Sequence, residues 1–213
     1  AALSAIKALE VDTVALMTLL KGRVSEDRSY AVISVALREL AGVDTEEAMK
    51  LAETLQTEKS SKIVYGITQL YAVKGGPEKF DFIKSALNGK VVRGFDRLGV
   101  LNSLTIFLTR QDPQVAEKAL DLYAKQSETG GMYMKMFLPQ NLSYLNRHFS
   151  KKLNELEEEL GAHEENNDAL YADQTRKKIA AYERVQNSYM ELAKRLEKKA
   201  SEDDMHQEEG QGR

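Results

Sequence analysis

The sequence predicts an all-α protein built of stacked helical hairpins, and three observations support this prediction. Proline occurs at only three of the 213 positions, namely 77, 113 and 139. Apolar residues recur at spacings of three and four along most of the chain, which is the period of one helix face. No segment alternates apolar and polar residues for long enough to suggest a strand. We therefore expect helices joined by short turns.

Residues typical of helix ends divide the chain into these helices. An apolar stripe runs through Tyr30–Leu40, and Gly42 follows it as expected after a helix C-terminus. Asp44 and Glu47 have the spacing of a capping box, which predicts a helix that begins after Asp44. Asp112-Pro113 places an N-cap residue before a proline at the first helical position. These signals predict where successive helices begin.

The predicted helix starts repeat at a period in the thirties. The first helices of four pairs begin near Asp12, Asp44, Pro77 and Asp112, at spacings of 32, 33 and 35 residues. The second helices begin near Asp27, Ser60, Phe95 and Gly131, at spacings of 33, 35 and 36 residues. One hairpin cannot bury its apolar face without neighbours, so this period predicts a solenoid. The ankyrin and TPR signatures are absent, which favours a HEAT-like α-α superhelix over those repeats; an irregular helical bundle is the alternative.

From Met132 onward the pattern predicts two longer helices in an antiparallel hairpin that closes the array. Their apolar stripes are Leu142, Leu145, Phe149, Leu153, Leu156 and Leu160, and then Ile179, Tyr182, Val185, Tyr189, Leu192 and Leu196. A polar break at 161–168 separates them. We therefore predict a single HEAT-like helical domain over 1–200, with the repeat array over 1–131 and the long hairpin over 132–200. Residues 201–213 are polar, and we expect a disordered tail there.

Composition argues against two classes of partner. Residues 151–213 hold 11 Lys and Arg against 16 Asp and Glu, and the remaining 150 residues hold 19 against 17. Neither part has the basic excess that binding to a phosphate backbone requires, so we expect no nucleic-acid partner. The longest apolar runs are only a few residues, so we expect no membrane partner. Cysteine is absent, which excludes disulfides and thiolate chemistry.

No catalytic, cofactor-binding or metal-ligating residue is predicted in this chain. The segment His163-Glu164-Glu165-Asn166-Asn167 resembles the zinc motif His-Glu-x-x-His, but asparagine occupies the position of the second histidine. The other two histidines, His148 and His206, have no ligand one turn away, and we interpret His148 as an ordinary helix residue. Gly75-Gly76-Pro77 lacks the Lys-Ser/Thr of a phosphate-binding loop and is explained by a turn.

Three further groups of residues have both a structural and a functional interpretation. We expect six aromatic residues in the core: Tyr65, Tyr71, Phe80, Phe82, Phe95 and Phe107. The cluster Met132–Phe137 predicts either a buried joint between helices or a docking surface for another domain. Arg93, Arg97 and Arg110 are either ordinary solvated side chains or contacts for a carboxylate.

The first repeats resemble the C-terminal HEAT-like helical domain of zinc aminopeptidases of the aminopeptidase N family. The resemblance rests on Ser29-Tyr30-Ala31-Val32 through Leu40-Ala41, on Val43–Ala48 and on Leu51-Ala52. There a helix rich in Ala and Leu is followed by an Asp-capped helix of the form Ala-x-x-Leu-Ala. The unit recurs from Asp112-Pro113 to Ala119-Leu120, so the resemblance spans most of residues 1–200.

This resemblance implies a non-catalytic role for the chain. In the family, a separate domain contains His-Glu-x-x-His, the zinc ion and the segment that binds the substrate's amino terminus, and none of these motifs occurs here. The resemblance therefore implies no cofactor in this chain, zinc in the catalytic domain of a parent enzyme, and two partners, namely that domain and the peptide substrate. Because Ala1-Ala2-Leu3 lies within a predicted helix, we expect a fragment. The alternative is a free-standing HEAT-like scaffold that binds a protein or peptide.

Overall fold

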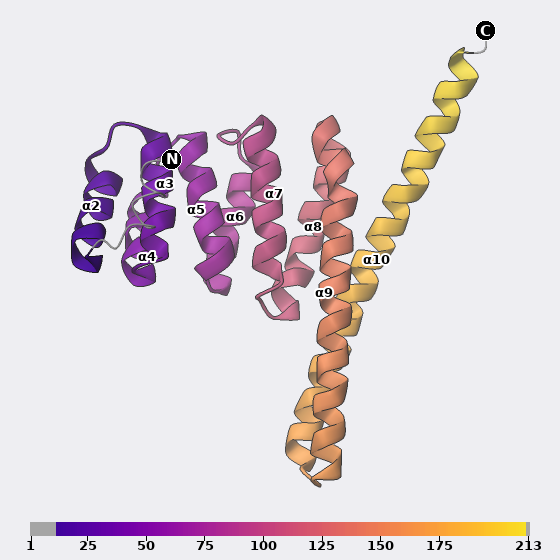
Figure 1. Cartoon of the computed structure of the whole chain (residues 1–213). Helices are drawn as coiled ribbons and strands as arrows, with labels where there is room; N and C mark the ends of the chain where they lie inside the picture. The colour runs from indigo at the N-terminus through magenta and orange to yellow at the C-terminus, as the bar shows by residue number, and fades with distance from the viewer. Residues whose placement is uncertain (1–11, 212–213) are drawn as a thin grey trace. The chain divides into compact units, whose positions relative to one another are not determined.

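The computed structural model describes the backbone of residues 12–211 and the side chains of residues 12–199, so the predicted helix at Ala1–Leu3 lies outside the described residues. The described residues form nine α-helices and one short 3₁₀ helix, with no strand among them (Figure 1). This confirms the all-α prediction. The helices are α2 (Thr13–Glu26), α3 (Tyr30–Ala41), α4 (Thr45–Thr54), α5 (Ser61–Lys74), η1 (Pro77–Lys79), α6 (Phe80–Asn88), α7 (Gly94–Leu108), α8 (Pro113–Thr129), α9 (Met132–Glu165) and α10 (Ala169–Gln211).

Most of the helix starts expected from the sequence are found. The Asp12 carboxylate accepts a hydrogen bond from the Val14 amide at 3.1 Å and caps α2. The Asp44 carboxylate accepts one from the Glu47 amide at 3.0 Å and caps α4. In a capping box the Asp44 amide would donate to the Glu47 side chain. Here it donates instead to the Leu40 carbonyl at 2.7 Å. Ser60 and Gly131 directly precede α5 and α9.

The chain divides into two compact units between Phe107 and Leu108, at the end of α7. The sequence pattern instead changes at Met132. The structure places α8 with the long hairpin because a buried hydroxyl of α10 bonds to it. The Tyr189 hydroxyl donates to the Ala116 carbonyl at 2.8 Å, and the Tyr189 ring packs edge-on against Tyr123 with centroids 5.6 Å apart.

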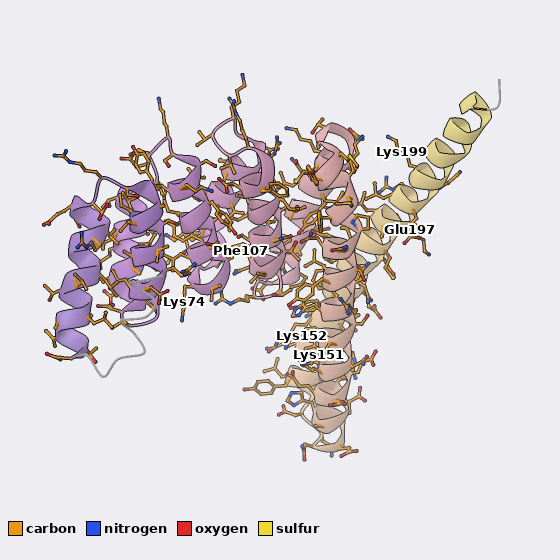
Figure 2. All side chains as sticks on the ribbon, turned by 45° about the horizontal axis from the view of Figure 1, so that its top comes forward. Lys74, Phe107, Lys151, Lys152, Glu197 and Lys199 are labelled. Atoms are coloured by element: carbon orange, nitrogen blue, oxygen red, sulfur yellow. The ribbon has the colours of Figure 1, made fainter. Side chains whose placement is uncertain are left out.

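In the first unit, α3 packs against α2, α4 and α5. Its buried residues are Ile33, Ala36, Leu37, Leu40 and Ala41. Phe107 is also buried (Figure 2). Its ring stacks on Phe80 with centroids 6.5 Å apart. Within the first unit, the second helices α3 and α7 therefore lie against neighbouring helices, as stacking requires.

Two glycines allow these second helices to approach closely. Gly66 of α5 lies against the Ser34 side chain of α3, and Gly99 of α7 lies against the Tyr65 ring of α5. A Cβ at Gly99 would lie 2.5 Å from Cε2 of that ring. The two glycines are 33 residues apart, so this contact repeats with the period of the hairpins.

In the second unit, α9 and α10 form the predicted antiparallel hairpin. Phe149 of α9 contacts two rings of α10, with centroids 6.2 Å from Tyr182 and 5.7 Å from Tyr189. Most residues of both predicted stripes are buried, and Leu160, Ile179 and Leu196 are partly exposed. Further along α10, Glu197 and Lys199 extend into solvent (Figure 2).

The hairpin differs from the sequence-based prediction at both of its ends. The connection is shorter than the expected break at 161–168, because α9 continues to Glu165 and α10 begins at Ala169. The turn closes with Asn167 in a left-handed conformation at φ 55°, which asparagine tolerates better than most residues. α10 extends to Gln211, so the helix includes most of the segment 201–213 that we expected to be disordered. Residues 201–209 contain neither glycine nor proline and can continue a helix.

Two other expectations are wrong. Phe95 is 69% exposed rather than buried, because it lies in the first turn of α7. Asp112 precedes α8 as expected, but its side chain makes no capping hydrogen bond. Tyr71, Phe80 and Phe107 are buried as expected, whereas Tyr65 and Phe82 are partly exposed.

We predict that Gly99→Ala leaves the first unit no more stable than the wild type. The added methyl group displaces the Tyr65 ring, whose hydroxyl accepts a hydrogen bond from Gln69 at 2.8 Å. Gly22→Ala is the matched control, because a Cβ there meets nothing within 4 Å. The control should raise stability by about 0.5–1 kcal/mol, the helix-propensity difference between the two residues. Urea unfolding measures both, and an equal stabilisation by the two variants would contradict the close contact.

We also predict that Gln126→Met stabilises the second unit by about 1–2 kcal/mol. The Gln126 side chain is fully buried, and neither its Nε2 nor its Oε1 has a hydrogen-bond partner among the described residues. Methionine has a similar volume and needs no polar partner. Gln114→Met, at an exposed position of the same helix, should change stability little. Urea unfolding measures both variants. A loss of stability in Gln126→Met would contradict the prediction, because it would indicate that the Gln126 side-chain amide has hydrogen-bond partners in the folded protein.

Candidate functional site

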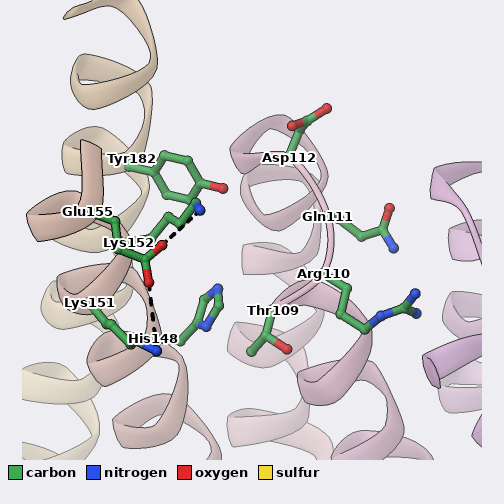
Figure 3. A pocket seen from close by; sticks show the side chains of 9 residues that line it. All are labelled: Thr109, Arg110, Gln111, Asp112, His148, Lys151, Lys152, Glu155 and Tyr182. Atoms are coloured by element: carbon green, nitrogen blue, oxygen red, sulfur yellow. Dashed lines mark hydrogen bonds and ion pairs between the residues drawn. The ribbon is translucent and has the colours of Figure 1, made fainter. Parts of the chain in front are cut away.

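A polar cleft of about 300 Å³ with charged lining lies in the second unit. One wall is the turn between α7 and α8, which contributes Thr109, Arg110, Gln111 and Asp112. The facing wall is a single face of α9, where the lining residues His148, Lys151, Lys152 and Glu155 have the spacing of successive helical turns. Tyr182 of α10 completes the cleft (Figure 3).

Two lysines of α9 share one carboxylate in this cleft. Lys152 Nζ lies 2.9 Å from Glu155 Oε2, and Lys151 Nζ lies 3.7 Å from Glu155 Oε1. The hydrogen bond from Lys152 holds the pKa of Glu155 below its usual value, and the same bond raises the pKa of Lys152. Lys152 and Glu155 are therefore both charged at neutral pH. With Arg110 and Asp112 included, the lining carries three cations and two anions.

His148 lies in the middle of the cleft wall, between Lys151 and Thr109 (Figure 3). Its ring makes no hydrogen bond to another described residue. Burial lowers the pKa of His148, and the Lys152 ammonium lowers it further, while the Glu155 carboxylate opposes the change. The imidazole is therefore neutral at pH 7, with one nitrogen that donates and one that accepts.

Tyr182 lies next to Lys152, and Asp112 lies at the end of the cleft away from His148 (Figure 3). The Tyr182 side chain is 8% exposed, and its hydroxyl makes no hydrogen bond to another described residue. Burial raises the pKa of Tyr182, so the hydroxyl remains protonated at neutral pH. The Asp112 carboxylate points away from the His148 ring (Figure 3). One end of the cleft therefore has a cationic and neutral-donor character, and the other end contains an acid.

A second cleft of about 300 Å³ lies in the first unit, at the C-terminal ends of α3 and α5. Its lining is mostly apolar, with Ala41, Leu70 and a half-exposed Val73. Arg38 and Lys74 also line it. This groove is suited to an apolar side chain next to an acidic group.

The structure separates the residues that the sequence analysis singled out. His163 lies in the last turn of α9, where its ring stacks on Tyr171 with centroids 5.5 Å apart and lies 3.6 Å from a Glu159 oxygen. It therefore has a structural contact at the hairpin turn. Within residues 12–199, no three His, Cys, Asp or Glu side chains are grouped so that they could hold a metal ion.

The three arginines have different environments. Arg93 is exposed, and its Nε donates to the Lys90 carbonyl at 3.0 Å. Nε of Arg97 is buried without a hydrogen-bond partner among the described residues. Arg110 lines the polar cleft.

The Met132–Phe137 cluster is divided between interior and surface. Met134 is buried at 5% exposure, whereas Met132, Tyr133 and Met136 are 79%, 54% and 50% exposed. The cluster is therefore not a uniformly buried joint, and one side of α9 presents apolar side chains to solvent.

Sequence reasoning did not identify the polar cleft. His148, Lys151, Lys152 and Glu155 follow the helical spacing of three and four, and this spacing places them on one face. However, nothing in the sequence pairs that face with the turn at 109–112. The one sequence feature that could have indicated the cleft is the pair Lys151-Lys152 one helical turn after His148.

Comparison with protein-family models, with curated proteins and with solved structures finds no match for this chain. None of the helices in the described part combines the length and the apolar character that crossing a membrane requires.

We predict that His148 makes folding less stable as the pH falls. Because its pKa is lowered in the folded state, protonation favours the unfolded chain. The stability is therefore fully present above the ordinary histidine pKa of about 6.5 and is lost as the pH falls through the lower folded value. His148→Gln should reduce the drop in thermal midpoint between about pH 7.5 and about pH 5. An NMR titration of the His148 ring that gave an ordinary or raised pKa would contradict this prediction.

Proposed function

We propose that this chain is a non-catalytic helical domain of a zinc aminopeptidase, an enzyme that removes N-terminal amino acids from peptides. In this proposal it packs on a separate catalytic domain and shapes the access of peptides to the active site. The zinc ion and every catalytic residue belong to that other domain.

The observation that carries the proposal is the repeat of helical hairpins. It includes the residues on which the resemblance to the aminopeptidase N family rests. Ala48 and Ala52 of the Asp44-capped helix are fully buried, as are Ala116 and Ala119 of the corresponding helix α8. Ala48 and Ala116 lie four residues after Asp44 and Asp112, and small side chains there let both helices pack closely. The α8 sequence reads Ala-x-x-Ala-Leu where α4 reads Ala-x-x-Leu-Ala.

The exposed apolar side of α9 supports a contact with another domain. Met132, Met136 and Tyr144 are 79%, 50% and 49% exposed, and they lie within the first four turns of the helix. Methionine and tyrosine are common at protein interfaces, where they provide adaptable or amphipathic contact. The catalytic domain is the partner that the proposal assigns to this surface.

A free-standing scaffold that binds a peptide is the second candidate. The groove at the ends of α3 and α5 favours it, because apolar side chains lie beside Arg38 and Lys74 there. The DNA upstream of this chain discriminates between the candidates. A His-Glu-x-x-His motif in the same reading frame supports the aminopeptidase proposal, and a start codon directly before Ala1 supports the scaffold.

We predict that the isolated chain neither hydrolyses aminoacyl p-nitroanilides nor retains stoichiometric zinc, whereas the longer polypeptide does both. Chromogenic assay and elemental analysis of the purified proteins measure these properties. Turnover that persists at constant specific activity through purification of the isolated chain would contradict the proposal.

We further predict that Met136→Asp weakens association with the catalytic domain by at least about tenfold, because a charge is buried at the contact. Leu170→Asp is the matched control, since Leu170 is 66% exposed at the hairpin turn and lies far along the chain from this surface. Calorimetric titration of the separately expressed domains measures both affinities. Equal affinities for the two variants would exclude this side of α9 as the docking surface.

A further inference from the structure

We propose that the polar cleft of the second unit binds a small oxyanion, in the form of a phosphate or carboxylate group. The site lies between the Lys151–Lys152 pair of α9 and the turn that precedes α8. This inference is independent of the proposed aminopeptidase role, because it rests only on residues 109–182 of this chain.

Both lysines of the cleft form ion pairs with a carboxylate of their own helix. Glu155 receives a hydrogen bond from Lys152 at 2.9 Å and lies 3.7 Å from the Lys151 ammonium. Each ammonium has three donors, and one carboxylate does not use all of them. The two lysines can therefore contact an external oxyanion while Glu155 competes for them.

Neutral donors lie next to these cations. The His148 ring has no hydrogen-bond partner among the described residues and can donate from one nitrogen at neutral pH. The Tyr182 hydroxyl also makes no hydrogen bond within the described part of the chain, and it lines the same space. Charge-assisted bonds from lysine together with neutral donors are the usual environment of a bound phosphate or carboxylate.

The size and the internal charges of the cleft restrict the ligand. A volume of about 300 Å³ admits a phosphate or a short carboxylic acid with some water. Asp112 repels an anion from its own end of the cleft. Because its carboxylate points away from His148, the geometry favours the side of the cleft formed by His148, Lys151 and Lys152 (Figure 3).

The binding experiment follows the His148 ring signals by NMR in the full chain, with assignment from the spectrum of His148→Gln. Sodium phosphate and sodium acetate are titrated separately at pH 7, with sodium chloride keeping the ionic strength constant. We expect a saturable shift of the His148 signals and a rise in the His148 pKa with bound anion. A response to either salt supports the oxyanion site. The ratio of the two affinities shows whether the site prefers the tetrahedral phosphate or the planar carboxylate. No response to either salt, or the same response to chloride alone, overturns it.

Two variants in the cleft should change the affinity in opposite directions. Lys152→Gln removes a charged donor and should weaken binding by about tenfold. Glu155→Gln removes the competing carboxylate and should tighten binding several-fold, a result that misfolding cannot produce. Lys177→Gln is the control, because Lys177 forms a similar exposed ion pair with Asp173 at 2.6 Å on α10, outside the cleft lining. The proposal is overturned if Glu155→Gln binds the anion more weakly than the wild type, or if Lys152→Gln and Lys177→Gln lose the same amount of affinity.

Discussion

The first unit depends on one packing constraint: the second helix of each hairpin must lie close to the second helix of the next, as α3, α5 and α7 do. An isolated hairpin leaves its apolar face in water, so its stability comes from neighbours. In the first unit this contact brings α3 against α5, with Ser34 on the backbone of Gly66. One repeat later, Tyr65 lies on Gly99. In the second unit the buried Tyr189 holds α10 against α8, because its hydroxyl donates a hydrogen bond to the Ala116 carbonyl.

This constraint also leaves separate surfaces available for binding. The buried faces are occupied by alanine, leucine and aromatic side chains, so charged residues are confined to turns and to outer helix faces. The polar cleft lies where an outer face of α9 meets the turn at 109–112. The exposed methionines of α9 lie near its N-terminus instead. Substitution in the cleft can therefore change anion binding without altering the apolar surface proposed for domain docking.

The sequence predicted the features that local rules determine. Asp12 and Asp44 cap the helices that they precede, and Phe149 and Val185 are buried at the positions that their spacing predicts. Sequence-based prediction failed where contacts between residues distant in the sequence determine the position of a side chain. Asp112 has the sequence of an N-cap, yet its carboxylate lines a cleft instead. Phe95 is exposed because a first-turn position need not face the core. The cleft itself was missed because α9 and the turn at 109–112 meet only through tertiary packing.

Native-state amide hydrogen exchange is the most direct test of the packing constraint. Under increasing denaturant, amides of α3 and α5 should converge on one opening free energy, since neither helix keeps a complete apolar environment without the other. Protection of α5 that persists after α3 has fully opened would contradict the account, because each hairpin would then be stable by itself.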